Sequence, residues 1–435
     1  MNKPTVLIMA PVATVSGYGA RSRDIAYSVI KSNKYNVKIW NTRWGSTPMN
    51  ALDPENAKHK AILDCLLTEP KLETQPEIFV QITVPNEFQR LGKFNIGITA
   101  GIETTIASAP WIEGCNRMDL VLTSSEHSKN VLQHSAWMKH NQQTQQAEGE
   151  MRLEKPIEVL FEGVDLDIYF QTKDINKTIN DELKEVKEDF AFLFVGHWLN
   201  GDFGEDRKNV SGLIRVFLEA FKNKAAHNQP ALVLKTSSAD FSKIDRDDII
   251  NKIEQIKRSV KGNLPNIYLL HGDLTDEEVN SLYNHPKIKA HITFTKGEGF
   301  GRPLAEASLS QKPIIAPNWS GHIDFLKEAV LLPGQLTNVH QSAAWENVLL
   351  QESQWMSVDF GYAMGVMRSV HEEYKNYKDL GKKQAYVIKS QFSLEAMDKK
   401  LAELLDKYVP EFPTQTELKL PELKKIQLPK LKKVI

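Results

Sequence analysis

The sequence predicts an α/β protein in which parallel sheets are covered by crossover helices. Short apolar runs alternate along the chain with segments of helical periodicity, which is the pattern of βαβ units. The length of 435 residues predicts two or three domains, each with enough residues to bury its own core. The apolar content of 41% and the charged content of 25% are those of an ordinary globular protein.

In the first half of the chain, apolar runs predict strands near residues 4–10, 36–41, 78–83, 94–99, 119–123 and 157–160. The first run leads into a turn with Gly17 and Gly19, and a helix is expected from about Ala20 to Lys31. A glycine-bearing turn between a strand and a helix can present backbone N–H groups to a phosphate. The dinucleotide fingerprint G-x-G-x-x-G is absent, because no third glycine follows at the required offset. The polar, low-complexity stretch 140–150 predicts a solvated insertion.

The second half repeats the pattern after a charged, apolar-poor stretch at 166–189 that is expected to be a linker. Strands are expected at 190–196, 231–236, 269–274 and in the run that ends at Thr295. Helices are expected at about 210–222 and 393–408.

The stretch from Lys296 to Ala307 follows a buried strand and carries the strongest functional signal. Gly299 and Gly301 flank Phe300, so the backbone of the turn can approach a ligand closely. Pro303 is at the start of the next helix, where a missing N–H is tolerated, and the N-terminus of that helix favours an anion or a hydroxyl-rich group. Glu298 and Glu306 can therefore reach one bound molecule from different sides. Carboxylates aimed at vicinal hydroxyls can hold a sugar or a ribose.

This stretch resembles the E-x7-E motif of the retaining glycosyltransferases of family 4. The segment from Ser310 to Leu326 is similar to the strand and small-residue turn that follow the motif in that family. The resemblance implies a GT-B fold, in which two Rossmann-like doubly wound domains face each other across a cleft and a C-terminal helix crosses back to the N-terminal domain. On this basis the chain divides into an acceptor-side domain (1–165), a linker (166–189), a nucleotide-sugar-binding domain (190–385), a crossing-back helix (386–409) and a Lys/Leu/Pro repeat tail (410–435).

The resemblance also implies roles for individual residues at the donor. Glu298 would contact the donor sugar, Glu306 would hold the nucleotide ribose, and the amides of Gly299, Phe300 and Gly301 would bind sugar hydroxyls. The expected donor-binding set is completed by Arg302, Pro303, Leu304, Gly17, Gly19, Lys235 and His271.

Two cations are expected at the donor diphosphate, where they would stabilise the negative charge of the leaving group. Lys208 matches the lysine of the family, and Arg207 is expected to supply the second cation, because His197 stands where an arginine is usual. Many members have a histidine near Glu103 that contacts the transferred sugar. Two interpretations of Glu103 stay open: it touches the substrate, or it caps a helix.

The implied activity is transfer of a sugar, with retention, from a UDP-, GDP- or ADP-sugar to a hydroxyl acceptor: a glycan, a lipid-linked sugar or a small molecule. No cofactor is expected, and no D-x-D with a metal-binding context appears, so no metal is expected either. Two alternatives remain open. The acceptor could be a hydroxymethylated base of phage-type DNA, or the chain could be a non-catalytic GT-B protein that binds a sugar or nucleotide.

Composition and net charge indicate in which compartment the protein works and which partners it binds. A net charge of −1 predicts no global attraction to nucleic acid or membrane. Two cysteines make neither a metal cluster nor a disulfide framework, and the N-terminus leads directly into an apolar strand, so a cytoplasmic protein is expected. The tail repeats a Leu-Pro unit and carries six lysines against three glutamates, so it could contact an anionic surface, membrane or nucleic acid, weakly. The other interpretation is a self-packing or disordered extension.

Overall fold

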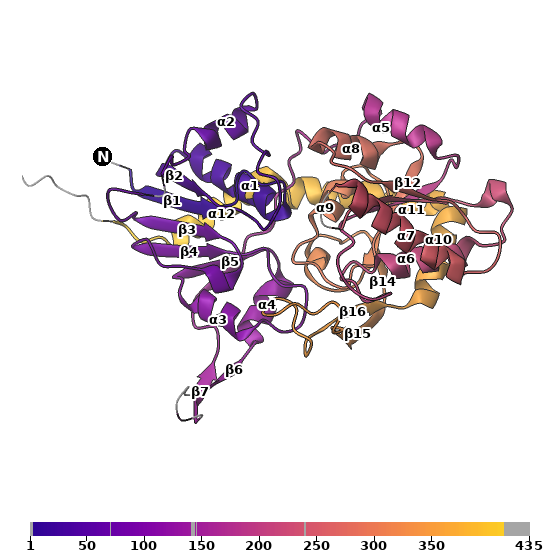
Figure 1. The fold of residues 1–435 in the computed structure, drawn as a ribbon. Helices are drawn as coiled ribbons and strands as arrows, with labels where there is room; N and C mark the ends of the chain where they lie inside the picture. Colours follow the sequence, from indigo (N-terminus) through magenta and orange to yellow (C-terminus); the bar gives the residue numbers. More distant parts are fainter. Residues whose placement is uncertain (1–2, 70, 141–143, 145, 239–240, 413–435) are drawn as a thin grey trace, which may run out of the picture.

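The structure is a computed structural model that describes residues 3–412 except 70, 141–143, 145, 239 and 240. These residues form two α/β domains that lie side by side and are joined by crossing segments of the chain (Figure 1). The repeat tail expected to contact an anionic surface lies outside the described residues beyond Phe412.

The first domain is built on a parallel sheet. Its spatial order is β2 (Asn36–Asn41), β1 (Thr5–Ala10), β3 (Ile78–Ile82), β4 (Phe94–Ile98), β5 (Leu120–Thr123) and β8 (Ile157–Val159). The associated helices are α1 (Gly17–Lys31), α2 (Ala57–Leu63), α3 (Ala109–Asn116) and α4 (Glu126–His134). Every strand expected in this half of the chain is confirmed. The inner strands are buried on both faces, which is why they read as continuous apolar runs.

The second domain repeats the architecture. Its spatial order is β11 (Ile267–Leu270), β10 (Ala231–Lys235), β9 (Ala191–Val195), β12 (Ile288–Ile292), β13 (Ile314–Pro317) and β14 (Val330–Leu332), all parallel. The associated helices are α5 (Lys177–Glu182), α6 (Val210–Phe221), α7 (Lys243–Ser259), α8 (Asp276–Asn284), α9 (Arg302–Ser308), α10 (Phe360–Glu372) and α11 (Tyr374–Gln391). In both sheets the strand order reverses beside the first strand of the domain, which places a ligand crevice at the carboxyl ends of the central strands.

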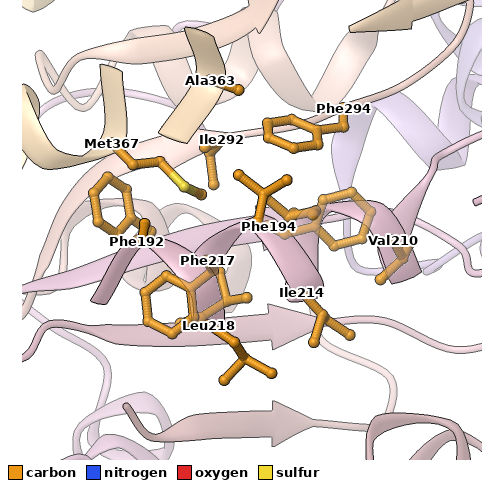
Figure 2. Close-up of a cluster of buried hydrophobic side chains, with 14 of the residues drawn as sticks. Phe192, Phe194, Val210, Ile214, Phe217, Leu218, Ile292, Phe294, Ala363 and Met367 are labelled. Carbon is orange, nitrogen blue, oxygen red and sulfur yellow. The ribbon is translucent and has the colours of Figure 1, made fainter. Parts of the chain in front are cut away.

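The core of the second domain follows from the alternation of side chains along β9. Phe192 and Phe194 point to the face covered by α6 and α10, where they pack with Phe217 and Met367 (Figure 2). Leu193 points to the opposite face and joins a different cluster. The two faces of the sheet are thus covered separately, and the strand is fixed in register.

The last helix, α12 (Leu394–Tyr408), returns to the first domain, as Figure 1 shows. Met397, Leu401 and Leu404 are buried in the same cluster as Val6 and Ile8 of β1. The expected helix that crosses back to the N-terminal domain is therefore present. The stretch that precedes β9 is folded as well, because Ile179 and Leu183 are buried against the second sheet.

Several elements differ from the sequence-based expectation. Helix α1 begins at Gly17 rather than at Ala20, because the Ser16 hydroxyl caps it and accepts a hydrogen bond from the Gly19 amide (2.9 Å). Strand β11 begins at Ile267 and ends at Leu270, so His271 lies beyond the strand.

Two antiparallel pairs were not expected. One joins β6 (Trp137–His140) to β7 (Ala147–Met151), at the flanks of the polar insertion, where residues 147–150 are exposed. The other joins β15 (Gly334–Asn338) to β16 (Gln354–Val358), and the Gln354 amide at the start of β16 donates to the Thr105 hydroxyl of the first domain at 2.9 Å. None of the described helices is long and apolar enough to cross a membrane.

Candidate active site

The residues expected to act on the donor meet where the two domains face each other. Glu103 follows β4 of the first domain, whereas Glu298 follows β12 of the second. Arg207 and Lys208 lie between β9 and α6. Because the carboxyl ends of parallel strands lie at one edge of a sheet, both sheets present their loops to the same interface.

These four side chains form one ion cluster. Lys208 Nζ donates a hydrogen bond to Glu298 Oε1, and Arg207 Nη1 donates to the other oxygen of that carboxylate at 3.3 Å. Arg207 Nη1 also donates to the Gly297 carbonyl at 3.0 Å and lies 3.6 Å from Glu103 Oε1. The cluster therefore joins the domains and holds two cations against two carboxylates.

A tight turn places the two cations. Asn209 adopts a left-handed conformation (φ 49°), and α6 begins at the next residue. The buried carboxylate of Asp206 accepts a hydrogen bond from the Val210 amide at 3.2 Å and so caps the helix. Burial raises the pKa of Asp206 to about 6, against the effect of the Val210 amide. Arg207 and Lys208 are thus fixed on a short, buried segment.

The two cations of the cluster determine the charge state of Glu298. Burial alone would raise the pKa of Glu298, but Lys208 and Arg207 outweigh that effect and lower it to about 2. Glu298 is therefore a carboxylate at neutral pH and acts only as a hydrogen-bond acceptor. Burial lowers the pKa of Lys208, which shares this carboxylate with the neighbouring Arg207.

Glu306 lies in a second buried group. Arg302 Nε donates to Glu306 Oε1 at 2.8 Å, and Arg302 Nη1 donates to Asp24 Oδ2 of α1 at 2.7 Å. The Tyr283 hydroxyl donates to the other oxygen of Glu306 at 3.4 Å. Burial raises the pKa of Glu306 to about 7, although Arg302 opposes the shift. The Arg302–Asp24 pair is a further ionic link between the domains.

The glycines of the motif serve close packing between the domains. A Cβ at Gly299 would lie 2.1 Å from the Ala100 carbonyl oxygen, and one at Gly297 would lie 1.9 Å from that of Glu103. Gly301 caps α9 in a left-handed conformation (φ 97°). Gly297 and Gly299 therefore bring the motif against the loop of the opposite domain.

The apolar residues of the motif anchor it in the second domain. Phe300 is buried and packs on Phe325, with ring centroids 4.8 Å apart. Leu304 is buried in the same cluster, and Pro303 is in the first turn of α9. The side chains of Phe300 and Leu304 thus fix the turn, which leaves its backbone for any contact with a ligand.

Lys235 and His271 lie together at the ends of β10 and β11. Lys235 Nζ donates to the Gly272 carbonyl at 2.5 Å, and His271 Nε2 lies 2.8 Å from a carboxylate oxygen of Asp245. His197, after β9, has a lowered pKa because of burial, Lys208 and Arg207, so its imidazole is neutral beside the cluster. None of the described hydrogen bonds joins Lys235 or His271 to Glu298.

Gly17 and Gly19 lie in the first turn of α1, not in a turn before it. The Gly19 amide is bonded to the capping Ser16 hydroxyl, and a Cβ at Gly19 would lie 2.2 Å from the Thr14 carbonyl oxygen. Gly19 therefore permits the close approach of the loop that precedes the helix. A phosphate would have to use other amides of this turn.

Glu103 does not cap the helix that follows it. Helix α3 begins at Ala109, with Ser108 as its N-cap residue. Glu103 instead lies in the loop between β4 and α3, beside Arg207, with a quarter of its side chain exposed. The capping interpretation is therefore wrong, whereas contact of Glu103 with a substrate stays a prediction.

Several residues around the motif were not predicted to take part. The Ser320 hydroxyl accepts a hydrogen bond from the Glu298 amide at 3.0 Å, and buried His322 contributes to lowering the pKa of Glu298. Asp324 accepts from the Glu126 amide at 2.8 Å and so caps α4 across the interface. The only signal in the sequence was their place in the turn that follows β13. Asp24 gave none, because its partner lies far away in the chain.

Among the described residues, no group of three or more His, Cys, Asp or Glu side chains could hold a metal ion. Both cysteines, Cys65 and Cys115, are free thiols.

No protein-family model matches the sequence, and a search of curated proteins finds no match. Solved structures do match over nearly the whole chain. Sucrose-phosphate synthase from Thermosynechococcus elongatus has a TM-score of 0.61 at 12% identity, over 93% of this chain and 99% of that one. A glycosyltransferase from Rickettsia africae has a TM-score of 0.60 at 13% identity, over 94% and 99%.

HepE from Anabaena, solved with UDP and glucose, has a TM-score of 0.57 at 12% identity, over 93% of this chain and 100% of that one. At these identities the likeness establishes the fold. The chain has the GT-B fold: two parallel-sheet α/β domains that face each other, with a last helix that returns to the first domain.

Proposed function

We propose that this chain is a retaining glycosyltransferase of the family 4 type, which moves a sugar from a nucleoside-diphosphate sugar to a hydroxyl acceptor. The observation that carries the proposal is the ion cluster of Glu103, Arg207, Lys208 and Glu298. These residues come from distant parts of the sequence and from both domains. The family resemblance predicts all four as site residues, and they lie in contact.

The two cations are suited to a leaving diphosphate. Arg207 and Lys208 are largely buried, so each requires an anionic partner, which Glu298 supplies in this structure. The phosphates of a donor would replace the Glu298 carboxylate as the partner of both cations. The N-terminus of α6 begins directly after them and adds favourable potential for a phosphate. The negative charge that develops on the leaving group would be stabilised by groups already in place.

The exchange of partners would free Glu298 for the donor sugar. While Lys208 and Arg207 contact Glu298, they hold its pKa at about 2, so its carboxylate is ionised at neutral pH. Its role would be to accept hydrogen bonds from sugar hydroxyls and so to orient the ring. Glu103 reaches the same position from the first domain, beside the acceptor side of the cleft.

Glu306 would hold the ribose of the nucleotide. Its carboxyl group is bracketed by Arg302 and Tyr283, which fix its orientation. With a pKa of about 7, it is roughly half protonated at neutral pH, and two ribose hydroxyls would favour the ionised form. Lys235 and His271, together at the neighbouring strand ends, are the candidates for contacts to the base.

We also propose the reaction conditions and the acceptor. Arg207 and Lys208 would neutralise the diphosphate in place of a divalent metal, so the transfer would need neither a metal nor a cofactor. The acceptor would be a hydroxyl on a glycan, a lipid-linked sugar or a small molecule. A reducing compartment, the cytoplasm, would suit the two free thiols.

The test is incubation of the chain with UDP-, GDP- and ADP-glucose, with UDP-glucose first because HepE was also solved with it. Release of the nucleoside diphosphate is measured, and proton NMR identifies the anomer of the sugar formed first. Slow release of the α-anomer from an α-linked donor is expected. A β-anomer would contradict retention. Donor binding with no turnover in any acceptor screen would indicate a non-catalytic GT-B protein.

A further inference from the structure

A groove of ≈ 380 Å³ lies on the second domain, between α6, α7 and the loop that follows β9. The loop contributes Trp198, Asp202 and Phe203, whereas the helices contribute Arg215 and Lys252. None of these residues belongs to the candidate active site. The groove is large enough for one small ring-bearing molecule.

The aromatic walls of the groove are held in place. Trp198 is only 4% exposed, and its backbone amide donates to the Ser237 carbonyl at 2.8 Å. Phe203 is 49% exposed, yet the loop on both sides of it is tied down. The Asp202 amide donates to the Ser342 hydroxyl, and the Gly204 amide donates to the Ser211 hydroxyl, both at 2.8 Å. An exposed phenylalanine on a fixed loop is a preformed apolar surface.

The groove also holds two cations without carboxylate partners. Arg215 lies over the Phe203 ring, with its Cζ 5.8 Å from the centroid, and Lys252 lies over the Trp198 ring, with its Nζ 5.4 Å away. No ion pair joins Arg215 or Lys252 to a carboxylate within the part of the chain that the structure describes. The Asp202 side chain is mostly exposed and lies 3.9 Å from His340. The groove therefore has an excess of positive charge beside the exposed ring of Phe203.

We propose that this groove binds a small phosphate-bearing ring compound, either a sugar phosphate or a nucleotide. The phosphate would accept charge-assisted hydrogen bonds from Arg215 and Lys252, which are stronger than their present contacts with aromatic rings. The ring would pack on the exposed side chain of Phe203, as sugar and base faces do on aromatic side chains. The hydroxyls of a sugar would find an acceptor in Asp202 at the rim.

The groove shares structure with the turn that carries the cations of the candidate active site. The Ser211 hydroxyl accepts from Gly204 of the groove loop and also contacts the Asp206 carboxylate at 3.4 Å. Asp206 immediately precedes Arg207 and Lys208. Because Ser211 joins the groove loop to this turn, a ligand that shifts the loop would also move the turn and so change the affinity of the active site for its donor. This coupling rests on the proposed function, whereas the binding itself does not.

The test is calorimetric titration of the full chain with glucose 6-phosphate, AMP and inorganic phosphate. We expect glucose 6-phosphate or AMP to bind. The compound that binds with the higher affinity shows whether the ligand is a sugar phosphate or a nucleotide. Inorganic phosphate is expected to bind at least about tenfold more weakly, because it lacks the ring. Equal affinity for inorganic phosphate would overturn the ring-bearing class, and no binding by any of the three would overturn the site.

Variants locate the binding. The double change Arg215→Ala with Lys252→Ala is expected to weaken binding by about a hundredfold, roughly tenfold for each charge-assisted contact. Arg258→Ala is the matched control, because it removes a cation of α7 that does not line the groove. Phe203→Ala should reduce the preference for the ring-bearing ligand over inorganic phosphate. Unchanged affinity in the double variant would refute the site.

The two proposals can fail separately. Titrations are repeated in Glu306→Ala, which weakens the donor site and should leave the groove unaffected. UDP binding to a wild-type chain that binds neither glucose 6-phosphate nor AMP would leave the proposed function standing and remove this inference.

Discussion

Replacing Lys208 with methionine removes one of the two cations that contact Glu298 and keeps most of the apolar side chain. Lys208 is 8% exposed, so its ammonium group acts in a surrounding of low effective dielectric. A preorganised donor aimed at charge that develops in the transition state contributes roughly 3–4 kcal/mol, or about 10²–10³ in turnover. We therefore expect Lys208→Met to lower kcat by about 10²–10³, with a smaller effect on KM.

The stability of the variant can be bounded from the same contacts. Glu298 retains Arg207 at 3.3 Å, so the loss should be smaller than the roughly 3–5 kcal/mol of a buried pair left without any partner. The pKa of Glu298 should rise from about 2 towards its ordinary value, because one of its two cations is gone. The folded chain should therefore survive, and the loss of turnover can be assigned to the site.

The assay measures release of the nucleoside diphosphate at saturating and at limiting donor. Lys287→Met is the matched control, because this lysine lies at the opposite end of β12 and donates to the carbonyls of Leu183 (2.9 Å) and Val186. The control is expected to keep the turnover of the wild type. A Lys208→Met protein that is folded and keeps its turnover to within about threefold would refute the assignment of Lys208 to the leaving group.

Three further predictions follow from the same contacts. Donor binding near pH 7 should release up to about half a proton, because the ionised form of Glu306 (pKa about 7) accepts the ribose hydroxyls. Glu306→Gln should abolish this proton release and weaken donor binding. Calorimetry in buffers of different ionisation enthalpy measures both effects. Asp24→Asn removes the charge from a cross-domain pair with Arg302 (2.7 Å) and should lower the free energy of unfolding by about 1–3 kcal/mol. An unchanged urea midpoint would show that this pair does not hold the domains together. Treatment with EDTA should leave turnover unchanged, and activity restored by magnesium or manganese would contradict a metal-free diphosphate site.

The pH dependence of stability should carry opposite signs for the two glutamates of the motif. Glu298 has a folded-state pKa below its ordinary value, so its contribution is present above about pH 4.5 and is lost as the pH falls towards 2. Glu306 has a raised pKa, so the folded chain binds its proton more tightly. Its contribution therefore declines as the pH rises from about 4.5 to 7.

The strands and the motif could be predicted because their signals are local. A buried parallel strand such as β9 is a short apolar run, and Glu298 and Glu306 stand at a fixed spacing around a glycine-bearing turn. Arg207 and Lys208 follow a strand in the same way. Each of these signals lies within a few residues of the feature it predicts.

What the sequence did not reveal depends on contacts between distant segments. Asp24 on α1 is unremarkable until α9 brings Arg302 to it, and Asp324 caps α4 only because the domains meet. The start of α1 at Gly17 depends on whether the Ser16 hydroxyl turns towards the helix, which residue type alone leaves undecided. The raised pKa of Glu306 depends on its burial and on the nearby carboxylates of Asp276 and Glu162, which the spacing of the motif does not predict.

Binding of nucleoside diphosphates is the most direct test of a donor site at the ion cluster. The full chain is titrated with UDP, GDP and ADP in a thermal-shift assay, and Glu306→Ala and Lys208→Met are measured beside it. We expect one of the three to stabilise the wild type and both variants to reduce the shift. No shift with any nucleoside diphosphate, in a chain whose fold is intact, would contradict a donor site at the ion cluster.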